Sequence, residues 1–128
     1  IHPNKNQMTH GRNQFVIKVK DFFLNSIDSE EKLESDLNQY LDYSPKSICR
    51  DWLKRNLEGL GVKTIIYYPI PIHLQPAYKS LGYSRGDLPK TEELCDQVLS
   101  LPIFPEITIE EQNHVIQSIK TLFNQLKI

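Results

Sequence analysis

The sequence predicts an α+β fold, a two-layer sandwich in which a small mixed or antiparallel sheet carries helices on one face. Residues 14–19 and 62–68 are rich in β-branched and aromatic side chains, which predicts two strands. Between them, residues 47–58 place apolar side chains at helical spacing and are followed by glycines. Because strand, helix, turn and strand follow in this order, we expect the helix to cover one face of the sheet.

Length and charge bound the class of protein. The 128 residues suffice for one globular domain, spanning 1–128, and the formal net charge is −1. No basic block is present, so we expect neither a nucleic-acid partner nor an anionic membrane. The longest apolar run, residues 65–74, is too short and too rich in proline to cross a bilayer.

Two cysteines, Cys49 and Cys95, stand far apart without a metal-binding or redox spacing. They predict free, buried thiols in a reducing compartment, and hence a cytoplasmic protein.

Residues 1–12 are polar and without period, which predicts a lead-in loop. His2 and His10 have no cysteine or carboxylate at a ligand spacing, so no metal site is expected there. The first residue is Ile rather than Met, which suggests that further sequence precedes it.

The run at 14–19 predicts a strand whose partner should be the central strand at 62–68. After it, Asp28-x-x-Glu31 is a capping box that predicts a helix ending at Ser44-Pro45. The next helix, from about 47 to 58, should bury one stripe of side chains beside Trp52. That stripe consists of Cys49, Leu53, Leu57 and Leu60.

Residues 64–78 are the stretch around which the chain is organised. The strand carrying Tyr67 and Tyr68 runs into Pro69 and Pro71, which cannot donate to a sheet, so the chain should leave as an extended, polyproline-like segment. This would present His73 and Gln75 on backbone that has little freedom left. The alternative is that the tyrosines only pack and that His73 is a satisfied surface imidazole.

The remaining elements follow from turn and capping signals. Residues 79–87 form a loop with two glycines, and Asp87 and Pro89 start a helix whose apolar face should hold Leu88, Leu94, Cys95 and Val98. A short strand at 99–105 is ended by prolines. The capping box Thr108-x-x-Glu111 opens a last helix that should pack on the sheet. Its apolar stripe consists of Val115, Ile116, Ile119, Leu122, Phe123 and Leu126.

Several of these segments together resemble the C-terminal part of the DegT/StrS family of sugar aminotransferases. They occur in the family's order and spacing, and the resemblance covers nearly the whole chain from Arg12 onward. The exception is a stretch at about 21–48, which looks like an insertion. The segments that carry the resemblance are Arg50-Asp51-Trp52-Leu53, Gly59-Leu60-Gly61-Val62, and residues 64–78, 81–83, 86–89 and 99–106.

This resemblance implies an enzyme that uses pyridoxal phosphate to pass an amino group from glutamate to a keto nucleotide-sugar. In the family the cofactor's lysine lies in a large N-terminal domain, and the lysines of this chain stand in none of its contexts. The chain alone should therefore neither hold the cofactor nor transaminate. Its implied partners are that missing large domain and, in a homodimer, a second subunit.

The resemblance also implies which residues of this part face the substrate. Tyr67, Tyr68, His73 and Gln75 match positions that present polar groups to sugar hydroxyls or phosphate oxygens. Tyr67 stands where some relatives have His. A tyrosine at this position resembles the subgroup acting on acetamido or deoxy sugars. No catalytic, cofactor-binding or metal-binding residue is implied for this chain.

Two other functions remain open from the residues themselves. A binding or regulatory module could keep the fold without catalysis and use the Phe22-Phe23-Leu24 cluster as its partner surface. Some members of the family carry the label "pleiotropic regulatory protein". A small hydrolase could use Cys49 or Cys95 with His73, although these residues are only scattered along the chain.

Overall fold

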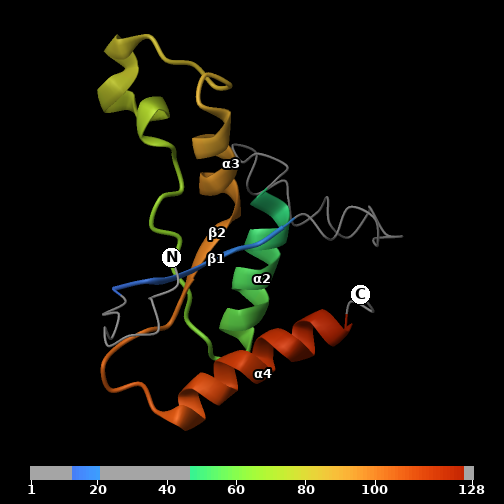
Figure 1. Ribbon diagram of the computed structural model, residues 1–128. Helices are drawn as coiled ribbons and strands as arrows, with labels where there is room; N and C mark the ends of the chain where they lie inside the picture. Colours follow the sequence, from blue (N-terminus) through green and yellow to red (C-terminus); the bar gives the residue numbers. More distant parts are fainter. Residues whose placement is uncertain (1–12, 21–46, 126–128) are drawn as a thin grey trace, which may run out of the picture.

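The computed structural model describes residues 13–20 and 47–125 and confirms the α+β class (Figure 1). The expectations for residues 1–12, for the helix after Asp28 and for most of the insertion lie outside these ranges. The elements are β1 (Phe15–Lys18), α2 (Ile48–Gly59), the 3₁₀ helices η3 (Ile72–Leu74) and η4 (Pro76–Leu81), α3 (Pro89–Gln97), β2 (Val98–Leu101) and α4 (Ile109–Gln125).

The sheet is organised around β2 rather than around residues 62–68. β1 pairs antiparallel with β2, with Val16 opposite Ser100. On the other edge of β2, Ser100 exchanges two backbone hydrogen bonds with Ile65, at 3.0 and 2.9 Å. The prediction that 14–19 pairs directly with 62–68 is therefore wrong. A strand has two hydrogen-bonding edges, and β2 uses both of them, so it lies between the two predicted partners.

The segment at 62–68 is extended, but within it only Ile65 forms a bridge. The predicted strand is thus a single point of pairing. The predicted extended departure from the sheet is formed only in part: Pro71 has φ −53° and ψ 138°, in the polyproline region, but residues 69 and 70 are bends and the 3₁₀ helix η3 begins at Ile72. β2 begins at Val98, one residue before the predicted strand, and ends before Pro102, which has no amide N–H to donate.

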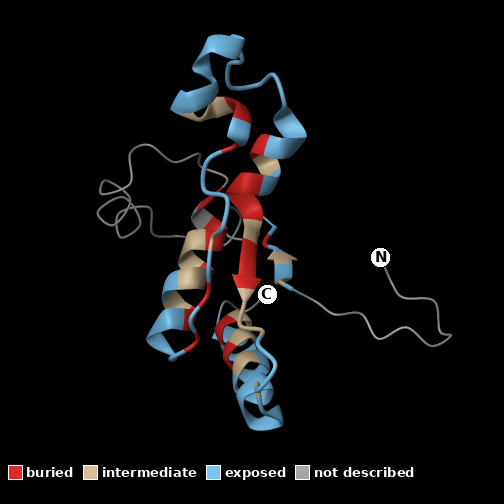
Figure 2. Ribbon diagram, turned by 90° about the vertical axis from the view of Figure 1, so that its left-hand side faces the viewer, coloured by how far each residue is buried: buried red, intermediate tan, exposed pale blue. Residues whose placement is uncertain are grey.

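The core lies where α2, β2 and α4 meet. As predicted, α2 buries Cys49, Leu53 and Leu57, whereas Leu60 follows the helix and remains 40% exposed. Figure 2 shows this buried face of α2 against β2. The full buried apolar cluster comprises Val19, Cys49, Leu53, Leu57, Val62, Leu99 and Leu122.

α4 begins with the predicted capping box. Thr108 Oγ1 accepts a hydrogen bond from the amide of Glu111 at 3.1 Å, and Glu111 Oε2 accepts one from the amide of Thr108 at 2.8 Å. The predicted stripe packs on the core through Val115, Ile119, Leu122 and Phe123, whereas Ile116 is exposed. No helix in the described parts of the chain combines the length and apolar character needed to cross a bilayer.

α3 starts at Pro89 as predicted, but its buried face differs from the expected one. Leu88 and Leu94 are 41% and 47% exposed. Cys95 is buried as predicted, and the other buried side chains are Glu92, Asp96 and Gln97. Apolar spacing therefore gave only part of the buried face, because α3 buries mainly hydrogen-bonding and charged groups rather than a hydrophobic stripe.

Residues 67–88, which we call the arm, extend from the sheet to the end of the molecule far from α4 (Figure 1). The arm contains η3 and η4 and has little of its surface covered (Figure 2). The arm therefore presents an apolar surface uncommon for an isolated domain. Its exposed large apolar side chains are Tyr67, Tyr68, Ile70, Ile72, Tyr78, Leu81, Tyr83 and Leu88.

Candidate functional site

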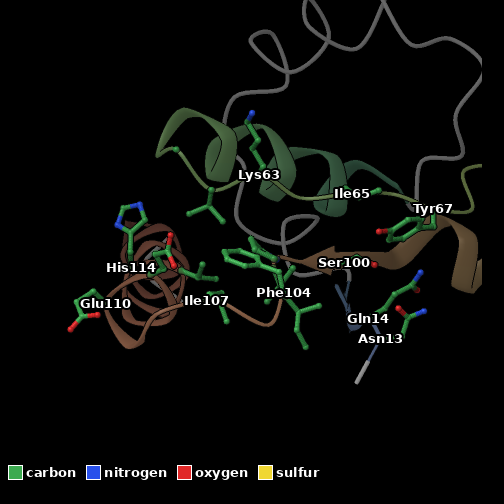
Figure 3. Close-up of a pocket in the computed structure, with 17 residues that line it drawn as sticks. Asn13, Gln14, Lys63, Ile65, Tyr67, Ser100, Phe104, Ile107, Glu110 and His114 are labelled. Carbon is green, nitrogen blue, oxygen red and sulfur yellow. The ribbon is translucent and has the colours of Figure 1, made fainter. Parts of the chain in front are cut away.

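A groove of about 690 Å³ lies between the 61–67 segment, the end of β2 and the first half of α4. Tyr67 stands at one end and His114 at the other, with Phe104 between them (Figure 3). The wall is shaped by the bridge that holds Ile65 to Ser100 and by the capping box that starts α4. Apolar side chains dominate the lining, among them Ile65, Leu101, Ile103 and Ile107.

Only part of the polar lining of this groove is available to a ligand. His114 Nε2 is 2.9 Å from the carbonyl oxygen of Leu60, and Glu111 is engaged in the capping box. The side chains of Lys63, Tyr67 and Glu110 make no polar contact with another described residue. A mostly apolar groove with a few free polar groups is typical of a small-molecule or peptide site.

The structure separates the four residues predicted to face the substrate. Tyr67 lines the groove, whereas Tyr68, His73 and Gln75 do not. Tyr68 is 57% exposed on the arm. Gln75 donates from Nε2 to the carbonyl oxygen of Ile70 at 3.4 Å, a contact within the arm itself.

His73 is buried rather than presented to solvent. Its Nε2 lies 3.0 Å from Oε1 of Glu92, and its ring stands edge-on to Tyr83 with 5.9 Å between the ring centroids. Its Nδ1 is buried and has no hydrogen-bond partner among the described residues. The alternative in which His73 is a satisfied surface imidazole is therefore wrong, and the side chain that holds the ring is Glu92.

Glu92 is a residue that the sequence analysis did not single out. Oε1 and Oε2 of Glu92 accept from the amide of Gly86 at 2.8 and 3.0 Å, and Oε1 accepts from the amide of Leu88 at 3.4 Å. The Gly86 hydrogen bond, helped by His73 and Leu88 against the effect of burial, lowers the pKa of Glu92. An acidic residue in the first turn after Pro89 was the available signal, since carboxylates there commonly accept free amides.

Arg50 of α2 connects this helix to α3. It is 1% exposed, donates to the carbonyl oxygen of Cys95 and pairs with Asp51 at 2.9 Å. Burial, with the charge of Asp96, raises the pKa of the Cys95 thiol. Both cysteines are free and buried, as predicted. A protonated Cys95 is the opposite of an activated nucleophile, which argues against Cys95 as the nucleophile of a Cys-His hydrolase.

The described residues do not fit pyridoxal phosphate. Every lysine in these ranges is exposed or only half-buried, and Lys18 and Lys54 are paired with Glu93 and Glu58. A cofactor lysine needs an enclosed site that tunes its amine. The same ranges contain no cluster of His, Cys, Asp or Glu suited to a metal ion.

Comparison with known proteins gives a consistent family. Residues 17–120 match the DegT/DnrJ/EryC1/StrS aminotransferase family. The chain is 43% identical over 86 residues to the "Pleiotropic regulatory protein" of Geobacillus stearothermophilus, covering 67% of this chain and 22% of the relative. It is 49% identical over 71 residues to the "Erythromycin biosynthesis sensory transduction protein EryC1" of Saccharopolyspora erythraea, covering 56% and 19%.

A third relative is the dTDP-3-amino-3,4,6-trideoxy-alpha-D-glucose transaminase of Streptomyces venezuelae, 39% identical over 71 residues, with 56% of this chain and 19% of the relative covered. Among solved structures, S. venezuelae DesV in complex with a ketimine intermediate matches with a TM-score of 0.55 and 38% identity, over 57% of this chain and 20% of that one. The chain thus spans about a fifth of the length of these proteins.

Proposed function

This chain belongs to the DegT/DnrJ/EryC1/StrS aminotransferase family, and from that premise we propose that it is the C-terminal small domain of a cytoplasmic sugar aminotransferase. The enzyme would transfer an amino group from glutamate to a keto nucleotide-sugar, with pyridoxal phosphate held by the larger part that the relatives possess. The observation that carries the proposal is the match over residues 17–120, together with relatives named as sugar transaminases.

In this proposal the chain contributes sugar recognition and the cofactor supplies the amino-transfer chemistry. Tyr67 offers a hydroxyl without a hydrogen-bond partner in the described part of the chain, at the end of an apolar groove, which suits a deoxy or acetamido sugar with few polar groups. Tyr68 and Gln75 lie on the exposed arm, where a large domain or a second subunit of a homodimer would meet them. His73 would contribute to sugar recognition from the arm, where its buried pair with Glu92 holds the ring in place.

The printed names of two relatives favour a second function. "Pleiotropic regulatory protein" and "sensory transduction protein" both describe regulation rather than catalysis. In that case the chain would be a non-catalytic binding module derived from the family, and its exposed arm would serve as a docking surface for another protein.

One experiment separates these functions. In a fusion protein, this chain replaces the matched segment of the parent enzyme, the S. venezuelae transaminase. The control is the parent enzyme with the same two junctions and its own segment between them. We expect this fusion protein to form the amino-sugar product from the parent's keto sugar. The regulatory alternative is favoured if the fusion protein folds and binds pyridoxal phosphate but forms no product, while the control does.

The chain alone provides the complementary measurement. Incubated with one equivalent of pyridoxal phosphate and reduced with borohydride, the chain should be labelled unselectively over its accessible lysines, because none of its described lysines is enclosed. Selective incorporation at a single lysine of the folded chain, lost when the chain is unfolded in denaturant, would contradict the assignment of the cofactor to another part of the enzyme.

A further inference from the structure

We propose that Glu92 is the positioning residue of the arm: its carboxylate sets which nitrogen of the neutral His73 ring carries the hydrogen and holds the Gly86 loop against η3. The inference rests on the proposed function only in the purpose that it gives to Glu92, which is to keep the arm in one shape for substrate. The contacts of Glu92 themselves do not depend on that function.

The first support is that one buried carboxylate joins three segments. Glu92 belongs to α3, accepts the amides of Gly86 and Leu88 from the preceding loop, and meets His73 of η3 at 3.0 Å. The exposed fractions of the His73 and Glu92 side chains are 5% and 9%. Because charged and buried hydrogen bonds are among the strongest in proteins, this carboxylate is a strong tie between η3 and the Gly86 loop.

The second support is the direction of the hydrogen bond between the two side chains. A carboxylate that already accepts two backbone amides is favoured in its ionised form and can only accept. The Nε2 of His73 must therefore be the donor, which leaves Nδ1 as the acceptor in the neutral ring. Without Glu92 the ring would have no such bias between its two neutral forms.

The third support is the position of Nδ1. It is buried and has no partner among the described residues. His73 is thus not presented to solvent with both ring nitrogens available to a ligand. Its Nε2 is committed to Glu92, and only Nδ1 could meet a donor from substrate or from another part of the enzyme.

Nuclear magnetic resonance on the intact chain tests the proposal without cofactor or sugar. In the neutral ring, the ¹⁵N shifts of His73 should show the proton on Nε2. Glu92→Gln keeps the shape but has a single acceptor oxygen, so it should give a mixture of the two neutral forms. The Gly86 amide should then exchange with solvent about 13- to 160-fold faster, the range for a lost hydrogen bond to a charged group.

Glu93→Gln is the matched control, because it removes one charge from the neighbouring position of α3, where the carboxylate pairs with Lys18 at 2.8 Å. It should leave the His73 ring nitrogens and the Gly86 amide unchanged. The proposal is overturned if wild-type His73 carries its neutral proton on Nδ1, a result that needs no variant to fold. It is equally overturned if folded Glu92→Gln behaves like Glu93→Gln.

These results are independent of the proposed function. The spectra of the chain decide the role of Glu92, whereas product formation by the fusion protein decides the sugar aminotransferase assignment. A fusion protein that makes no product therefore contradicts the assignment and leaves the spectra of the chain as the measure of Glu92.

Discussion

Tyr67 differs from the other three candidate residues because it alone lines the groove, where its hydroxyl has no hydrogen-bond partner among the described residues. We expect Tyr67→Phe in the fusion protein to lower kcat/KM for the keto sugar about 2- to 13-fold, the range for one lost hydrogen bond of about 0.5 to 1.5 kcal/mol. The ring remains, so the groove keeps its shape. Steady-state kinetics with varied sugar measures the change.

Tyr78→Phe is the control for this substitution. Tyr78 is 43% exposed, similar to Tyr67 at 48%, but lies in η4 outside the groove. It should leave kcat/KM unchanged. Equal effects of the two substitutions would show that general properties of the arm, and not the groove hydroxyl, govern turnover.

At the scale of the element, α4 matters because its first turn forms one wall of the groove. Thr108→Ala removes the hydroxyl that accepts the Glu111 amide and leaves that donor unpaired. We expect a loss of about 0.5 to 2 kcal/mol in the free energy of unfolding, measured by urea denaturation. The dependence on urea should keep its slope, since the same surface is exposed on unfolding.

Thr121→Ala provides the comparison, because Thr121 is exposed in the interior of the same helix. Alanine is the better helix former, so this change should be neutral or slightly stabilising. If Thr108→Ala is as mild as Thr121→Ala, the capping box contributes nothing measurable to α4.

For the whole molecule, the exposed arm predicts self-association of the chain. Its many exposed apolar side chains are best covered by a second copy of the chain when no other protein is present. The sedimentation coefficient should therefore rise with concentration. Leu81→Glu, at a side chain 65% exposed in η4, should reduce this rise by placing a charge in the contact.

Ile109→Glu tests whether the effect belongs to the arm. Ile109 is 71% exposed but lies at the start of α4, away from the arm. It should leave the association as in the wild type. Equal responses of the two variants, or a wild-type chain that stays monomeric at high concentration, would contradict association through the arm.

The sequence by itself determined the elements whose signals are local. The α2 stripe, the start of α3 at Pro89, the capping box of α4 and the prolines that end β2 all act within a few residues, so spacing and side-chain chemistry were sufficient. The family was also recognisable, because its motifs lie along the chain in a set order. Tyr67 was identified as a candidate in the same way.

Only the tertiary structure decided which segments meet. β2 became the middle of the sheet because its two edges pair with segments far apart in sequence, and no local signal specifies such a choice. Glu92 and His73 are 19 positions apart, and their pairing reversed the expected exposure of the imidazole. The α3 face was misjudged for the same reason, since a buried carboxylate is stable only where distant donors surround it.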